Sequence, residues 1–167
     1  YRQTAISWAA ERGHLDVVNA LYKKGADIDN RDKYDRTLPY WACSNGKQDV
    51  IDYFLSNEQN ASHKYYNGRN LLFVATGYGS LDDVKRFLKS DPNPCDDKRM
   101  TPFMFAVQKS HVGNVEALRD AGAKPLLKDN AKRSALHYAV ESHLSAAIIG
   151  RLISVGCDVN ARDSGGK

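Results

Sequence analysis

The sequence has few of the features that mark secreted, membrane or metal-binding proteins. It holds only three cysteines and five prolines in 167 residues. No apolar run approaches the roughly 18 residues of a membrane span, and we expect no cleavable signal sequence. Three cysteines make no disulfide framework, so we expect a reducing compartment, cytoplasm or nucleus. The net charge of +4 does not by itself imply nucleic acid.

Motifs that carry chemistry are also scarce. Gly77 and Gly79 lie at the end of an expected helix, so they predict a turn rather than a nucleotide loop. The histidines are scattered, and none has zinc-ligand spacing to a cysteine. His14 and His111 share one repeat position, where we expect the ring to bond to neighbouring backbone. No catalytic set is suggested, so we expect no catalysis, no cofactor and no metal.

What the chain does contain is one motif repeated five times. It reads T-A-I-S-W-A-A-E-R-G-H-L-D-V-V-N-A-L from Thr4, and related versions begin at Thr37, Asn70, Thr101 and Ser134. These starts are 33, 33, 31 and 33 residues apart. A fixed period in this range marks a stacked-repeat architecture, in which each unit buries its apolar face on its neighbours.

The motif resembles the ankyrin repeat, whose signature is T-P-L-H-x-A-A, then G-H, an aliphatic helix and G-A-D-V-N-A. The matching residues are Thr101, Pro102, Ala106, Ser134, Leu136, His137, Ala139, Gly13, His14, Gly25, Ala26, Asp27, Gly156, Asp158, Val159 and Asn160. The resemblance implies an all-α repeat solenoid of five stacked ankyrin repeats, each with two helices and a hairpin loop. The repeats span about 4–36, 37–69, 70–100, 101–133 and 134–167, in a single domain over 1–167.

The segment S-W-A-A-E-R-G-H is similar to segments in the ankyrin arrays of fungal multidomain proteins. We expect the chain to be a piece of a longer protein.

Local signals predict where helices end and where the backbone is strained. The first unit predicts helices at about Ala5–Arg12 and Leu15–Lys24, with Gly25 at positive φ after the second. The hairpin turn two residues before each unit also favours positive φ. That position holds Asp35, Gly68, Arg99, Lys132 and Gly166. Arginine or lysine there should cost on the order of 1 kcal/mol. The fifth unit carries one extra residue in its helix–helix turn, near 143–145.

In ankyrin repeats, partners usually contact the hairpin tips and the concave face of the first helices. Carried over position by position, the tip residues are Arg31, Lys33, Tyr34, Arg36, Lys64, Tyr66, Arg69 and Arg133. The first helices contribute Trp8, Glu11, Arg12, Trp41, Tyr78 and Lys109. The resemblance therefore implies a non-catalytic scaffold for protein–protein interaction, and we expect a monomer.

Repetition also aligns two basic rows. The residue before each unit gives Arg36, Arg69, Met100, Arg133 and Lys167, and the residue five earlier gives Arg31, Lys64, Cys95, Lys128 and Arg162. Such rows predict an acidic, extended segment as partner. Local neutralisation is the alternative, by Asp32, Asp35, Asp96, Asp97, Asp129 and Asp163. A further alternative is nucleic acid or anionic lipid, which would bind with steep salt dependence.

An aromatic column runs through the first helices, at Trp8, Trp41, Val74, Phe105 and Tyr138. The simplest interpretation is packing between adjacent helices. The alternative is that Trp8, Glu11 and Trp41 resemble the methyl-lysine cage in the ankyrin arrays of euchromatic histone methyltransferases. Gln3 stands where that family has a further tryptophan, so one wall of the cage is absent.

Overall fold

The structure is a computed structural model that describes residues 3–34, 36–56, 68–88 and 91–167. Within these residues the regular secondary structure is helical, with an isolated antiparallel bridge between Lys128 and Ser134. The first helices of the five units are α1 (Ala5–Arg12), α3 (Leu38–Ser44), α6 (Leu71–Tyr78), α8 (Pro102–Gln108) and α10 (Ala135–Glu141). The second helices are α2 (Leu15–Lys23), α4 (Gln48–Ser56), α7 (Leu81–Phe87), α9 (Val112–Asp120) and α11 (Ala146–Ser154). None of these helices is long and apolar enough to cross a membrane.

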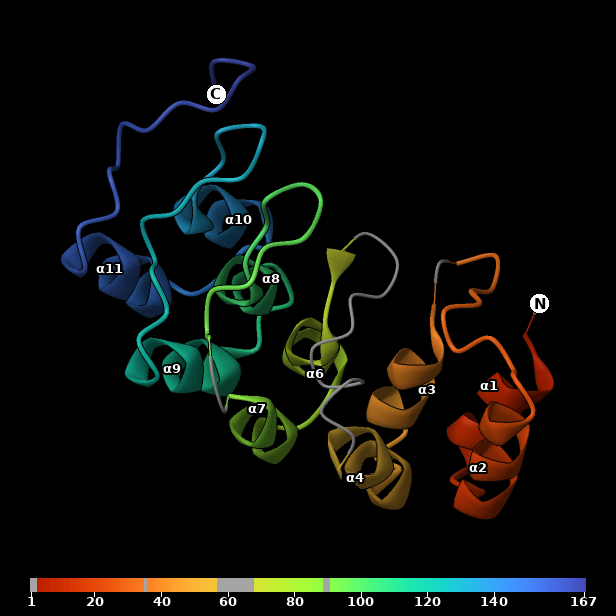
Figure 1. Cartoon of the computed structure of the whole chain (residues 1–167). Coiled ribbons are helices and arrows are strands. Elements are labelled where there is room, and N and C mark those ends of the chain that lie inside the picture. Colours follow the sequence, from red (N-terminus) through yellow and green to blue (C-terminus); the bar gives the residue numbers. More distant parts are fainter. Residues whose placement is uncertain (1–2, 35, 57–67, 89–90) are drawn as a thin grey trace.

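The helix pairs stack in single file, as predicted for a repeat solenoid. α1, α3, α6, α8 and α10 contact one another in succession and form one layer, while the second helices form the other (Figure 1). Hairpin loops project beyond the first helices, and we call them fingers. Fingers 1, 3, 4 and 5 comprise residues 27–36, 91–100, 124–133 and 158–167. Of finger 2, only residues 68 and 69 are described.

The helices are too short to persist alone, so capping and stacking hold them. The side chains of Thr4, Asn70 and Thr101 each accept a hydrogen bond from the backbone N–H three residues later, at 3.4, 3.2 and 3.3 Å. The predicted first helix is confirmed, and the second ends one residue early, at Lys23. Gly25 has φ +83°, which confirms the predicted helix end.

Several turns force non-glycine residues into the left-handed region. The finger prediction is confirmed, because Arg99 and Lys132 have φ of +59° and +61°. Asp35 lies outside the described residues. The turn between the two helices of a unit has the same property, with φ of +60° at Ser110 and +52° at His143. Each of these residues carries backbone strain of about 1 kcal/mol or more.

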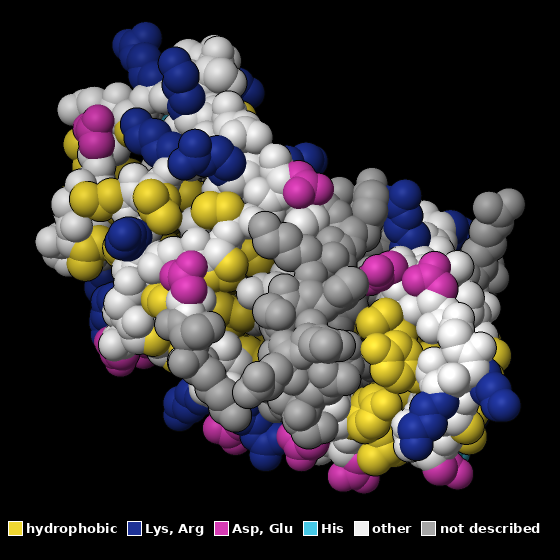
Figure 2. Space-filling view, in the orientation of Figure 1, with side chains coloured by type: hydrophobic (Ala, Val, Ile, Leu, Met, Phe, Trp, Pro, Cys, Tyr) yellow, Lys and Arg dark blue, Asp and Glu magenta, His cyan; other side chains and the backbone are white. Residues whose placement is uncertain are grey.

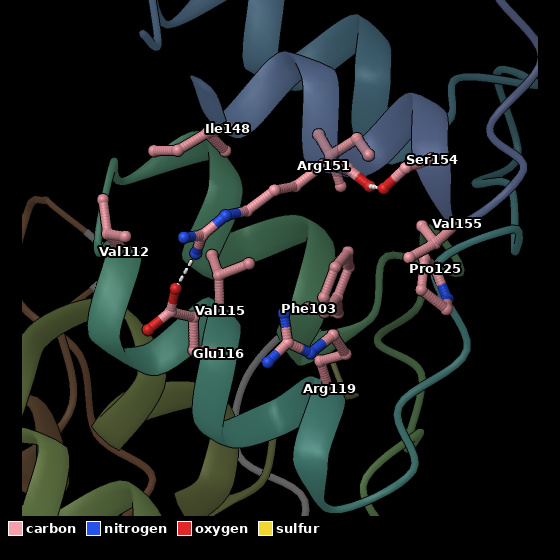
Figure 3. A pocket seen from close by; sticks show the side chains of 11 residues that line it. Phe103, Val112, Val115, Glu116, Arg119, Pro125, Ile148, Arg151, Ser154 and Val155 are labelled. Atoms are coloured by element: carbon pink, nitrogen blue, oxygen red, sulfur yellow. Dashed lines mark hydrogen bonds and ion pairs between the residues drawn. The ribbon is translucent and has the colours of Figure 1, made fainter. Parts of the chain in front are cut away.

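The extra residue predicted in unit 5 is present between His143 and α11. A hollow of about 130 Å³ lies between α9 and α11 on the second-helix layer (Figure 3). Val112, Val115 and Ile148 line this hollow. An exposed ion pair of Arg151 with Glu116 bridges it, so the two helices stay connected.

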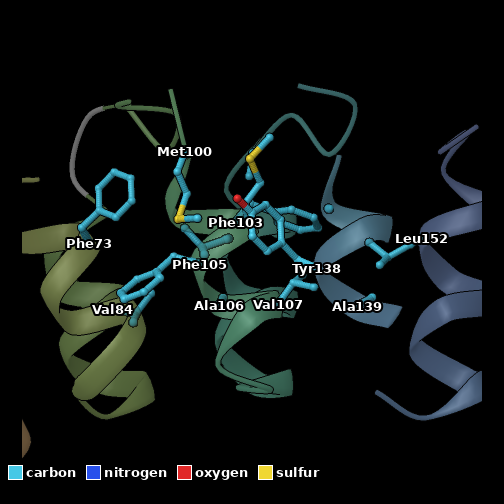
Figure 4. Close-up of a cluster of buried hydrophobic side chains, with 14 of the residues drawn as sticks. Phe73, Val84, Met100, Phe103, Phe105, Ala106, Val107, Tyr138, Ala139 and Leu152 are labelled. Atoms are coloured by element: carbon cyan, nitrogen blue, oxygen red, sulfur yellow. The ribbon is translucent and has the colours of Figure 1, made fainter. Parts of the chain in front are cut away.

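The buried side chains form two clusters along the stack. The N-terminal cluster is aliphatic, with Ile6, Leu38, Val50 and Ile51 among its members. The C-terminal cluster holds the buried phenylalanines, the methionines and Tyr138 (Figure 4). α6 contributes to both, so it joins them. Cys43 and Cys157 are buried, and burial raises the pKa of both thiols.

Polar bonds between units supplement these clusters. The carbonyl of Thr76, near the end of α6, accepts from the buried Asn114 at 3.0 Å. The His111 ring lies 3.2 Å from the same carbonyl, which confirms the predicted bond to backbone. Unit 4 thereby satisfies a carbonyl that the end of a helix leaves without an intrahelical partner.

Candidate partner-binding face

An aspartate at one repeat position shapes each finger that carries it, and its side chain is buried in fingers 1, 3 and 4. In finger 3, Asp96 Oδ1 accepts the backbone N–H groups of Lys98 and Met100, both at 2.9 Å. The equivalent carboxylates are Asp32, Asp129 and Asp163, and each accepts the N–H four residues later. These bonds fix the turn from inside, so the finger backbone is organised before any partner arrives.

Two arginines of the predicted row pair with the aspartate of their own finger. Arg36 Nε donates to Asp32 Oδ2 at 2.7 Å, and Arg133 Nε donates to Asp129 Oδ2 at 3.1 Å. The aspartate side chains are almost wholly buried, at 1% and 3% exposure. These charge-assisted bonds neutralise much of the charge of Arg36 and Arg133 locally.

The row of arginines before each unit is interrupted at Met100, and an ion pair between two units compensates for the missing arginine. Finger 3 has Met100 where its neighbours have arginine, so Asp96 has no arginine of its own. Finger 2 has Tyr65, outside the described residues, where its neighbours have aspartate. Arg69 therefore reaches across to the next finger, with its Nε 3.2 Å from Asp96 Oδ2. An ion pair between units replaces the pair within each finger.

The same three arginines stack on aromatic rings. The guanidinium carbons lie 4.2 Å from the Trp41 centroid, 4.3 Å from Phe105 and 4.5 Å from Tyr138, for Arg36, Arg69 and Arg133. Each is thus held between a buried carboxylate and a ring face. This arrangement rigidifies the finger base and leaves only part of each arginine accessible, from 21% to 32% of the side chain.

Burial and hydrogen bonding shift the pKa of the finger carboxylates in opposite directions. Burial alone would raise the pKa of Asp129, but the hydroxyl of Tyr138 at 2.7 Å and the donors of Arg133 outweigh it. The pKa of Asp129 therefore lies below its ordinary value. The pKa of Asp32 is also lowered, because the Arg36 side chain and the backbone N–H groups of Tyr34 and Arg36 outweigh the effect of burial. Burial, and then the bond to Asp129, raise the pKa of Tyr138.

Trp8, Glu11 and Trp41 do not enclose an open cage. The Trp8 side chain is 46% exposed, and the Arg12 guanidinium lies 5.0 Å from its ring centroid. Arg36 covers one face of Trp41, and Glu11 accepts a hydrogen bond from Gln3 at 2.7 Å. A cation of the chain itself therefore lies over one face of each indole.

The remaining predicted residues are distributed along the fingers and first helices. On finger 1, Tyr34 is 57% exposed, the Lys33 ammonium lies 4.7 Å from its ring centroid, and Arg31 is exposed. On the inner layer, Tyr78 is 4.5 Å from Tyr40 by ring centroids. Lys109 lies 5.1 Å from the Tyr78 ring. Lys64 and Tyr66 lie outside the described residues.

A group of exposed cations lies on fingers 3, 4 and 5. Lys128 and Arg162 belong to the second predicted row, whereas Lys98, Arg99 and Lys132 lie outside both rows. They are exposed, and within the described residues no ion pair joins Lys98, Arg99, Lys128, Lys132 or Arg162. Figure 2 shows lysine and arginine side chains clustered over these fingers, above hydrophobic side chains. We call these five residues the tip cations. The sequence could not show that they differ from the row arginines in exposure, because both groups carry the same charge.

The single-file stack, its capped helix pairs and its projecting fingers define a helical repeat solenoid. A family model described as ankyrin repeats in three copies matches residues 6–93 and again residues 71–163. The chain therefore belongs to the ankyrin repeat family, as its sequence predicted. Ankyrin repeats are protein–protein interaction modules and are typically not enzymes. No curated protein matches the chain.

Proposed function

We propose that this chain is a non-catalytic scaffold that binds an acidic, extended segment of another protein along its fingers and first helices. The observation that carries the proposal is the line of exposed cations on fingers 3 to 5, at Lys98, Lys128, Lys132 and Arg162, free of ion partners in the described residues. The fingers hold these charges on turns that aspartate side chains fix. A rigid, positively charged edge steers an acidic segment and loses little conformational entropy on binding.

Finger 1 and the first helices would provide further anchoring contacts. Tyr34 and Tyr78 offer ring surface, with Lys33 and Lys109 beside them. The accessible edges of Arg36, Arg69 and Arg133 would complete this surface. These three arginines mainly stabilise the finger backbone. We therefore assign long-range steering of the partner to Lys98, Lys128 and Lys132. Aromatic and arginine side chains are the residue types that most often dominate binding energy at interfaces.

The test uses a fluorescently labelled peptide rich in Asp and Glu as the probe. The triple variant Lys98→Glu, Lys128→Glu and Lys132→Glu should lower the association rate on the order of tenfold at low salt. The wild-type affinity should fall as salt is raised. Reversal of the row arginines is unsuitable, because it would leave buried aspartates without their partners.

A matched control carries the same change in net charge on the other layer. Lys23→Glu, Lys24→Glu and Lys85→Glu alter exposed residues in or beside α2 and α7. This control should bind the peptide nearly as fast as the wild type. Equal rates for both triple variants would overturn the finger proposal, because only net charge would then matter.

Two other ligands separate the alternatives. Tighter binding of a DNA duplex or of anionic vesicles than of the acidic peptide would contradict a protein segment as partner. The wild type could instead prefer a dimethyl-lysine peptide over its unmodified form, and Trp41→Ala could abolish that preference. This result would replace the proposal by binding of methyl-lysine in an aromatic cage. The cations over Trp8 and Trp41 favour the acidic peptide over the methyl-lysine peptide.

A further inference from the structure

The hollow between α9 and α11 has an apolar floor and lies on the layer of second helices, away from the fingers (Figure 3). Phe103, Ile148 and Leu152 form the floor, and each is at most 9% exposed. Val112 and Val115 line the hollow from α9. α7 packs against α9, whereas α9 and α11 have few direct contacts. The hollow therefore lies at a junction inside the stack, between units 4 and 5.

Arg119 occupies a repeat position that is apolar in every other unit. Its equivalents are Tyr22, Leu55, Leu88 and, once the extra residue of unit 5 is allowed for, Ile153. Tyr22 and Leu88 pack against the buried clusters of the stack. The Arg119 side chain is 43% exposed, so this position of unit 4 contributes no apolar side chain to the junction. An arginine here leaves space between the units and places a guanidinium group at its edge.

The polar side chains around the hollow favour an anion. Two arginines and one glutamate line it, and the ion pair of Arg151 with Glu116 compensates the charge of the glutamate. Arg119 donates from Nε and Nη2 to one oxygen of Asp120, at 3.1 and 2.8 Å. These bonds use two of the five N–H groups of the guanidinium. The pair with Asp120 is exposed and therefore weak, so Arg119 remains able to bind a second carboxylate.

We propose that this hollow binds a small carboxylate that carries a single aromatic ring. Its volume of about 130 Å³ is close to that of an apolar cavity of about 150 Å³ that binds benzene. The ring would rest on Phe103, Ile148 and Leu152, and the carboxylate would accept charge-assisted hydrogen bonds from Arg119. An apolar floor with a few polar groups that fix orientation is the usual design of a small-molecule site.

The test uses phenylpropionate as the probe and observes the methyl groups of Val112, Val115 and Ile148 by NMR. These signals should shift saturably as phenylpropionate is added. The amide of the same acid keeps the ring without the charge and should bind on the order of tenfold more weakly. Acetate keeps the charge without the ring and should cause no saturable shift. A wild-type chain that gives no saturable shift with phenylpropionate would overturn the proposal, and so would equal affinities for acid and amide.

Two variants of one residue separate the charge from the space. Arg119→Gln removes the charge, so the affinity for phenylpropionate should fall to that of the amide, which itself should bind as before. Arg119→Leu restores the residue of Leu55 and Leu88 and should fill the hollow, which would abolish binding of both probes. The control is Arg86→Gln on α7, an exposed arginine that pairs with Asp52 and should leave both affinities unchanged. Circular dichroism should show the same helical content in all variants.

The same variants distinguish this site from the finger surface and from a simple packing defect. The triple finger variant should bind phenylpropionate like the wild type, and Arg119→Leu should bind the acidic peptide like the wild type. Failure of the peptide to bind would therefore leave the hollow unaffected, and the reverse holds too. A packing defect would make Arg119→Leu more stable without any saturable shift in the wild type. Phenylpropionate binding that survives in Arg119→Leu would place the ligand elsewhere and refute the site.

Discussion

The N-terminal and C-terminal units form the same helix–helix turn with different residues. The turn between the two helices has glycine at positive φ in units 1 and 2, at Gly13 and Gly46, but Ser110 and His143 in units 4 and 5. The cores differ in parallel. Units 1 and 2 bury aliphatic side chains, whereas units 4 and 5 bury phenylalanine, methionine and tyrosine.

The comparison teaches where a repeat stack tolerates strain. A non-glycine residue at positive φ persists only where surrounding contacts over-determine the backbone. Phe103, Phe105 and Tyr138 bury large ring surfaces in α8 and α10, the helices that lead into the strained turns of units 4 and 5. The aliphatic units bury less per side chain, and their turns use the residue that is least strained at positive φ.

The largest expected effect comes from removing core side chains from each half. Phe103→Ala should lower the free energy of unfolding by about 4 kcal/mol, because it deletes a fully buried ring. Leu38→Ala in the aliphatic cluster should lower it by about 3 kcal/mol, since less volume is removed. Urea unfolding followed by circular dichroism measures both.

Hydrogen exchange then shows whether the two halves are separable. Units of a stack contact only their neighbours, so Leu38→Ala should speed exchange in α1 to α4 before it does so in α8 to α11. Equal acceleration along the whole stack would show that the clusters unfold as one.

An intermediate effect is expected from the finger carboxylates. Asp129→Asn weakens bonds from Tyr138 and Arg133, and Asp32→Asn weakens bonds from Tyr34 and Arg36. Each should lower the free energy of unfolding by about 2 kcal/mol at neutral pH. If the Tyr138 bond matters, the Asp129 variant is the less stable of the two.

The pH dependence of that effect has a defined sign. The pKa of each aspartate is lower in the folded chain than in the unfolded chain. The stabilisation is therefore fully present above the ordinary aspartate pKa of about 3.9 and is lost as pH falls through the lower folded value. The gap between wild type and variants should close over that acidic range. A gap that is constant from neutral to acidic pH would mean that ionisation contributes nothing.

The smallest effect comes from exchanging the turn residues. Ser110→Gly should stabilise the chain by about 0.5 kcal/mol, and Gly46→Ser should destabilise it by about 1 kcal/mol. A Cβ at Gly46 meets no atom within 4 Å, so the cost there is backbone strain alone. Thermal unfolding of the two variants measures both signs. Two changes of the same sign would refute the assignment of strain to these turns.

Much of the backbone could be predicted because its causes are local or repetitive. The 33-residue period located the helices, Gly25 marked a helix end, and Arg99 and Lys132 were predicted at positive φ from their place in the turn. The side-chain network was less predictable. The two basic rows looked uniform, yet the row arginines are bound to aspartates and rings, while the tip lysines are not.

The sequence by itself determined that the chain is a stack of ankyrin repeats, because a fixed period and a helical pattern leave few ways to bury the apolar residues. Only the tertiary structure decided that Arg69 reaches into the next finger and that Asn114 caps a carbonyl of the unit before it. The physical reason is that a long side chain can reach several partners, and burial depends on what the neighbouring unit covers.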